Sequence, residues 1–118
     1  MSVVESKLVE LGYTLPSPPE PIGNYRAAAR SGKVMWMSGV GSRRADGLTI
    51  SGKLGADLTV EQGYEAAQLC ALNLLARMKV ELGDLDRVTG ILKVVGMVNS
   101  SPDFEEQAKV VDGASDLF

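Results

Sequence analysis

The residues best placed to bind a small molecule lie where a short apolar strand ends in a hydroxyl group and a glycine. The strand, Val34–Met37, belongs to the sequence KVMWMSGVG and is followed by Ser38 and Gly39. A strand that ends in this way leaves backbone N–H groups unpaired beside an open space, which suits a small anionic ligand. Upstream, the sequence PIGNY forms a proline-glycine turn that brings Tyr25 to the start of an extended segment.

The absence of histidine removes several kinds of active site. Because the sequence has no histidine, it holds no Ser-His-Asp or Cys-His arrangement and no histidine-ligated metal site. Without an imidazole to activate it, Ser38 is interpreted as a hydrogen-bonding residue. The single Cys70 falls in an apolar helical pattern, which predicts a buried, unreactive thiol and fits the reducing cytoplasm. We expect no metal and no cofactor, and a site that positions a polar molecule and a water.

Other motifs carry less weight. The sequence Gly39-Val40-Gly41 would need a third glycine at position 44 to match a dinucleotide-binding loop, and that position is Arg44. Asp84 and Asp86 are close in sequence, but they are interpreted as a helix-to-strand turn and not as an acid-base pair.

The charge balance argues against nucleic acid. The formal net charge is −3 and the isoelectric point is about 4.9. The one adjacent basic pair, Arg43-Arg44, lies in a predicted loop and is interpreted as a solvated tip. No segment has the apolar run of a signal peptide or the length of a membrane span. We therefore expect a cytoplasmic protein with neither nucleic acid nor membrane as a partner.

Local patterns predict the elements that hold the strand end. A short amphipathic helix is expected over Val3–Leu11, and a proline-rich, extended connector follows it. Two strands are expected at Arg26–Arg30 and Val34–Ser38, and a tight hairpin turn containing Gly32 joins them.

A long amphipathic helix is expected over Val60–Leu82. Thr59 and Gln62 form a capping box at its start, and Gly83 ends it. Its apolar face is expected to pack against the sheet. The residues of that face recur at spacings of three and four: Tyr64, Ala67, Ala71, Leu74, Met78 and Leu82.

The remaining segments predict an incomplete sheet. The glycine-rich stretch Gly41–Asp57 is expected to be a loop with at most one short strand. A long strand is expected over Arg87–Asn99, and then a helix capped by Ser101, with Pro102 at its first position, that weakens at Asp112-Gly113. Since no strand follows this helix, either the helix packs alone on a small sheet or the sheet needs strands from elsewhere.

In their order and spacing these pieces resemble the Rid (reactive intermediate deaminase, YjgF-like, endoribonuclease L-PSP) family. The resemblance covers residues 21–118, and the N-terminal helix and connector resemble a less characterised branch. It rests on the tract PIGNY, the strand end Ser38-Gly39, the glycine loop up to Gly55, Asn73-Leu74 in the long helix, and Asp103-Phe104.

The resemblance implies a fold and an activity. The fold would be chorismate-mutase-like and α+β, a mixed sheet with helices packed on one face. It would form a single domain over residues 1–118, with the helix and connector in 1–21 and the core in 22–118. Family membership further implies a homotrimer with ligand clefts between subunits. The implied reaction is cofactor-free hydrolysis of reactive enamines or imines of the 2-iminobutanoate and 2-iminopropanoate type, so the partner would be a small carboxylate-bearing metabolite.

The resemblance also assigns site residues. Tyr25 corresponds to the family tyrosine that packs beside the substrate, and Ser38 and Gly39 correspond to the strand end that lines the cleft. Val40 stands where many members have glutamine, so that contact is lost or replaced. An asparagine expected in the last helix has only Gln107 and Asp112 as neighbours of its position.

The departures from the family pattern keep the function open. Family members continue with a strand that carries the arginine gripping the substrate carboxylate, and then a strand with an acidic residue. Neither is present up to Phe118, so no catalytic residue is assigned. We expect this chain to be a poor deaminase and a version extended by its natural downstream residues to be a better one. The alternative is a non-catalytic small-molecule-binding or structural trimer, and a ribonuclease-like activity is third.

Overall fold

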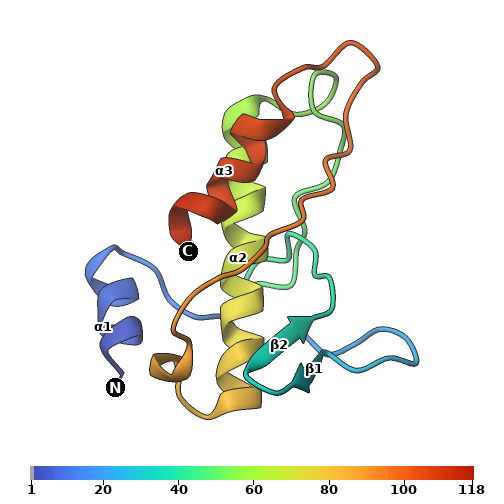
Figure 1. The fold of residues 1–118 in the computed structure, drawn as a ribbon. Coiled ribbons are helices and arrows are strands. Elements are labelled where there is room, and N and C mark those ends of the chain that lie inside the picture. The colour runs from blue at the N-terminus through green and yellow to red at the C-terminus, as the bar shows by residue number, and fades with distance from the viewer. Residues whose placement is uncertain (1) are drawn as a thin grey trace. The chain divides into compact units, whose positions relative to one another are not determined.

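The computed structural model describes residues 2–118 (Figure 1). These residues form two compact units. The first unit comprises the residues up to Val40 together with Leu72–Thr89, and the second comprises Gly41–Ala71 and Gly90–Phe118. The elements, in chain order, are α1 (Val3–Glu10), β1 (Ala28–Ser31), β2 (Val34–Met37), α2 (Val60–Leu82), η1 (Leu85–Arg87, a 3-10 helix) and α3 (Gln107–Leu117). The described residues thus combine helices with an antiparallel sheet, and the α+β class is confirmed.

The first helix, α1, matches its prediction closely. The Ser2 hydroxyl accepts a hydrogen bond from the Glu5 amide and caps the start of the helix. Gly12 adopts a φ of 89°, and this left-handed conformation ends the helix at little steric cost.

The predicted hairpin is also present. β1 and β2 pair antiparallel, with Ala28 opposite Met37 and Ser31 opposite Val34. This register leaves a two-residue turn, in which Gly32 has a φ of 60°. The strands differ from the predicted ranges by one or two residues at their ends, where strand assignment is least certain from sequence.

Helix α2 has the predicted bounds, because strong signals mark both of its ends. The Thr59 amide donates to the Gln62 side chain at 2.9 Å, and the Gln62 amide donates to the Thr59 hydroxyl at 3.2 Å. The buried face is shifted from the predicted one, since Leu74 is only half-buried. The buried apolar side chains of α2 are Ala71, Leu72, Leu75, Ala76 and Met78.

The long strand predicted over Arg87–Asn99 is not formed. Arg87 ends η1, and residues 88–99 have no regular secondary structure. The end of the segment is tied to Leu54: the Asn99 carbonyl accepts from the Leu54 amide, and the adjoining Ser100 makes an isolated bridge to Leu54. A strand requires a neighbouring strand for its backbone groups. Here the apolar side chains between residues 91 and 97 are exposed, Met97 to 94%, while Val88 and Val98 are half-buried.

The last helix begins later than predicted and continues through its supposed weak point. The Ser101 amide donates to the Leu54 carbonyl at 2.9 Å, so this backbone belongs to the bridge and not to a helix cap. Helix α3 begins at Gln107 and includes Gly113, which is buried. Glycine is tolerated there because α3 lies against α2 at this point (Figure 1): a Cβ on Gly113 would clash with the Tyr64 carbonyl oxygen.

The longest helix is too polar to be a membrane span. None of the helices within residues 2–118 combines the length and the apolar character needed to cross a bilayer.

Candidate functional site

The end of the hairpin opposite its turn brings the predicted strand end beside the segment that follows Tyr25. The Ser38 amide donates to the Ala27 carbonyl at 2.9 Å, which continues the pairing one step beyond β2. The Ser38 hydroxyl donates to the Arg26 carbonyl at 2.5 Å. Ser38 therefore ties the two chain segments together, and its oxygen lone pairs stay available as acceptors.

Beyond Ser38 the backbone is open. A Cβ on Gly39 would meet no atom within 4 Å, and Gly39 is exposed while Val40 is half-buried. Within residues 2–118, the amides of Gly39 and Val40 donate no hydrogen bond. Two successive amides without partners next to open space can donate hydrogen bonds to a carboxylate or another small anion.

Tyr25 adopts a local fold of its own. Its ring lies over Gly23, where a Cβ would stand 3.2 Å from Cε2 of the ring. The Ile22 amide donates to the Tyr25 hydroxyl at 3.4 Å, and the Tyr25 amide donates to the Gly23 carbonyl at 3.0 Å. The side chain is 47% exposed. The proline-glycine turn thus holds the tyrosine at the approach to β1, with an accessible face.

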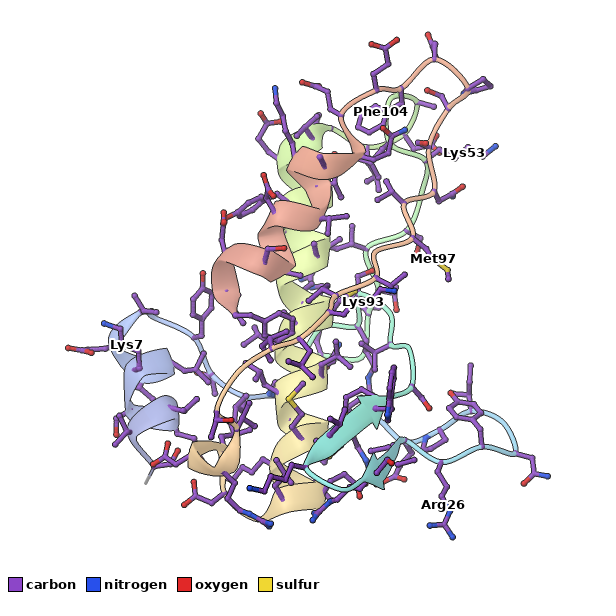
Figure 2. All side chains as sticks on the ribbon, viewed as in Figure 1. Lys7, Arg26, Lys53, Lys93, Met97 and Phe104 are labelled. Carbon is purple, nitrogen blue, oxygen red and sulfur yellow. The ribbon has the colours of Figure 1, made fainter. Side chains whose placement is uncertain are left out.

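The arginine side chains of the first unit do not reach the strand end: three of them bind other groups, and Arg26 is exposed. Arg30 donates to the Glu81 carbonyl at 2.6 Å, and Arg87 donates to the Leu82 carbonyl at 2.8 Å. Arg77 forms an ion pair with Glu81 at 2.8 Å. Arg26 is exposed, and its side chain extends away from the ribbon (Figure 2). None of these four guanidinium groups supplies a fixed positive charge at the strand end.

A second polar feature of the first unit lies at the start of α1. It is an open hollow of about 440 Å³. Its lining residues are Ser2, Glu5, Lys79, Gly83, Asp84 and Asp86. None of the predicted site residues contributes to it. Within residues 2–118, no three histidine, cysteine, aspartate or glutamate side chains are grouped so that they could hold a metal ion.

Cys70 lies in α2 and is half-buried. Burial raises the pKa of its thiol above the usual value, because the thiolate would lose solvation there. A raised pKa lowers the fraction of thiolate at neutral pH, so the thiol is a weak nucleophile.

Sequence reasoning missed the role of Asp86. Its carboxylate accepts hydrogen bonds from the amides of Val3 and Val4, both at 2.9 Å, and caps the start of α1 from the far side of the sequence. No local pattern could reveal a contact between residues more than eighty positions apart. Asp84 does act locally, because its side chain accepts from the Asp86 amide and begins η1. No strand follows, so the predicted helix-to-strand turn is instead a turn into a 3-10 helix.

A family model and a curated relative each match nearly the whole chain. A family model described as "YjgF/chorismate_mutase-like, putative endoribonuclease" matches residues 5–118. The curated Protein TCP17 of Trypanosoma cruzi is 44% identical over 123 aligned residues, which cover 100% of this chain and 77% of that protein.

Two solved structures are similar over nearly the whole chain. One is a "putative endoribonuclease" from Shewanella oneidensis, with a TM-score of 0.92 and 37% identity over 97% of this chain and 76% of the other. The second is protein Atu1372 of Agrobacterium tumefaciens, described as having unknown function, with a TM-score of 0.87 and 39% identity over 98% of this chain and 69% of the other.

Proposed function

The chain belongs to the YjgF/chorismate-mutase-like family, and from that premise we propose that it hydrolyses small, carboxylate-bearing imines and their enamine tautomers without a cofactor. Water adds to the imine carbon, the C–N bond of the resulting carbinolamine breaks, and the products are a 2-keto acid and ammonia. Such intermediates arise in amino-acid metabolism in the cytoplasm, and the single cysteine of this chain fits a reducing compartment.

The observation that carries the proposal is the open strand end. The unpaired amides of Gly39 and Val40 offer hydrogen bonds to the carboxylate of the substrate. The Ser38 hydroxyl donates to the main chain, so its oxygen can accept a hydrogen bond from the substrate nitrogen or from the attacking water. Tyr25 provides an aromatic face at the approach to β1. In this arrangement the protein acts by positioning the reactants.

The catalytic efficiency, kcat/KM, is expected to be low, because the site lacks a strong contact for the substrate carboxylate. A bidentate arginine usually holds a substrate carboxylate, and charge-assisted contacts of that kind are worth about 1.5–3 kcal/mol. The arginines of the first unit have other partners or extend away from the strand end. We expect the substrate to saturate the site only at high concentration, with a correspondingly high KM.

The test of this site removes one backbone N–H donor, that of Val40, and compares the result with a substitution that keeps it. Val40→Pro deletes the N–H group, while the matched control Val40→Ala keeps it. With the imine generated in situ from an amino acid by a dehydratase, wild-type protein should accelerate keto-acid formation. Val40→Pro should lower kcat/KM about tenfold or more, since a hydrogen bond to a charged group is lost, and Val40→Ala should stay within about twofold.

The other outcomes distinguish the alternatives. No acceleration by wild-type protein, together with keto-acid-induced shifts of the Gly39 and Val40 amide resonances, would favour a small-molecule-binding protein without catalysis. Equal loss in both variants would show that the amide is not the contact. Cleavage of RNA by the same preparation would favour the endoribonuclease activity that the family description names. The acidic isoelectric point and the absence of histidine disfavour that activity.

We further propose that the protein assembles as a homotrimer. The apolar side chains of residues 91–97 are exposed, and an assembly that covered them would remove this surface from water. Light scattering at micromolar concentration should give about three times the mass of one chain. A stable monomer would refute the trimer and would weaken the assignment of a site shared between subunits.

A further inference from the structure

Helix α1 has few apolar attachments for its length. Of its eight residues, Leu8 alone is fully buried, whereas Val3 is 77% exposed and Val9 is also exposed. An isolated helix shorter than about 12 residues is marginal in water. The stability of α1 must therefore come largely from contacts at its ends.

Those contacts are polar and concentrate at the first turn. Both carboxylate oxygens of Asp86 accept backbone N–H groups, Oδ2 from Val3 and Oδ1 from Val4, each at 2.9 Å. Lys79, near the end of α2, forms an ion pair with Glu5 at 3.0 Å. A carboxylate at a helix N-terminus also interacts favourably with the helix dipole. The α2–η1 corner thus holds α1 by charge.

Two of these charged side chains, Asp86 and Lys79, are open to water, whereas the Glu5 side chain is only 17% exposed. Asp86 is exposed and lines the open hollow with Glu5, Lys79 and Asp84. The amides of Val4 and Val3 hold the pKa of the Asp86 carboxyl below its ordinary value, so the group is ionised at neutral pH. Interactions between exposed charges are weakened by salt, whereas apolar packing is not.

We propose that α1 is an electrostatic latch: it opens as a unit when the contacts of Asp86 are weakened, while α2 and the β1–β2 hairpin stay folded. Opening uncovers Leu8 and the side of η1 that α1 contacts. The latch would allow the N-terminal segment to be displaced without unfolding the elements that hold the strand end.

Hydrogen–deuterium exchange measured by mass spectrometry tests the latch. Asp86→Asn keeps the shape but removes the charge and one of the two acceptor oxygens. The control Glu10→Gln removes the same charge from α1, where Glu10 makes only an exposed ion pair with Lys7 at 3.8 Å. Exchange in residues 2–12 should rise about fivefold or more in Asp86→Asn, the scale of a lost helix cap, and should be unchanged in Glu10→Gln.

Salt provides a second arm that needs no variant. In about 1 M sodium chloride, where the Debye length is about 3 Å, exchange of residues 2–12 should rise in the wild-type protein and exchange in α2 should not. Unchanged exchange of residues 2–12 in both arms would overturn the latch. Equal acceleration across α1 and α2 would also overturn it, because α1 would then open only with the rest of the fold.

Discussion

Leu85→Ala should lower the free energy of unfolding by about 2–5 kcal/mol. Leu85 is 1% exposed, and among the residues described it is the largest side chain that is fully buried. It lies in η1, which follows α2 and which α1 contacts. Neighbouring side chains therefore cannot close the space left by the three deleted carbons unless α1 or η1 moves. The loss therefore combines transfer of apolar surface with a cavity.

Leu48→Ala is the matched control for this prediction. It deletes the same atoms, but Leu48 is 63% exposed and lies outside residues 91–97, so the change should stay within about 0.5 kcal/mol. Urea unfolding followed by far-ultraviolet circular dichroism measures both variants. A small effect of Leu85→Ala would mean that the η1 corner contributes little to the core. Equal losses in the two variants would mean that burial of Leu85 is not the cause of its effect.

The elements that sequence reasoning located correctly are those whose signals are local. Helix α2 is bounded by a capping box at Thr59 and Gln62 and by Gly83, whose φ of 80° ends the helix. The hairpin follows from Gly32 and two short apolar runs. In each case residues close together in the sequence determine the conformation.

The errors arise where a distant partner decides the structure. Residues 88–99 have the composition of a strand, but a strand forms only beside another strand, and no composition can provide that neighbour. Ser101 and Pro102 carry a helix-start signal, yet the Ser101 amide is taken by the Leu54 carbonyl. The long-range hydrogen bond outweighs the local preference.

The local parts of the candidate site could be predicted from the sequence, and its long-range contacts could not. The small residues after β2 follow from the sequence, and the hydrogen bonds of Ser38 to the segment after Tyr25 follow from hairpin pairing. The cap that Asp86 provides for α1 could not be foreseen, because it joins residues from opposite ends of the first unit's sequence.

Gly113→Ala should destabilise the protein although it improves a helix. Gly113 lies inside α3, where alanine is favoured over glycine by about 1 kcal/mol in intrinsic helix propensity. Against this gain, the added Cβ would clash with the Tyr64 carbonyl oxygen and would stand 3.0 Å from the Ala67 Cβ. A backbone oxygen near the start of α2 cannot swing aside as a side chain can, so α3 must move away from α2.

That movement would disturb contacts on both sides of Gly113. The buried Val110 and Ala114 lie on the same face of α3, and the Tyr64 hydroxyl donates to the Asp116 carboxylate at 2.7 Å. Overpacking of this kind costs about 1–3 kcal/mol and sometimes more. Because the clash involves a backbone atom, we expect it to exceed the propensity gain and to leave a net loss of about 1–2 kcal/mol.

Gly90→Ala shows what the substitution does without a neighbour. Gly90 belongs to the same unit, has no left-handed φ, and has no atom within 4 Å of the added Cβ. Its replacement should be neutral or slightly stabilising, because alanine restricts the unfolded chain. Urea unfolding of the two variants and of the wild type measures these changes in the free energy of unfolding. If Gly113→Ala is as stable as Gly90→Ala, then α3 does not approach the Tyr64 carbonyl in solution, and the glycine is not required for the contact between α2 and α3.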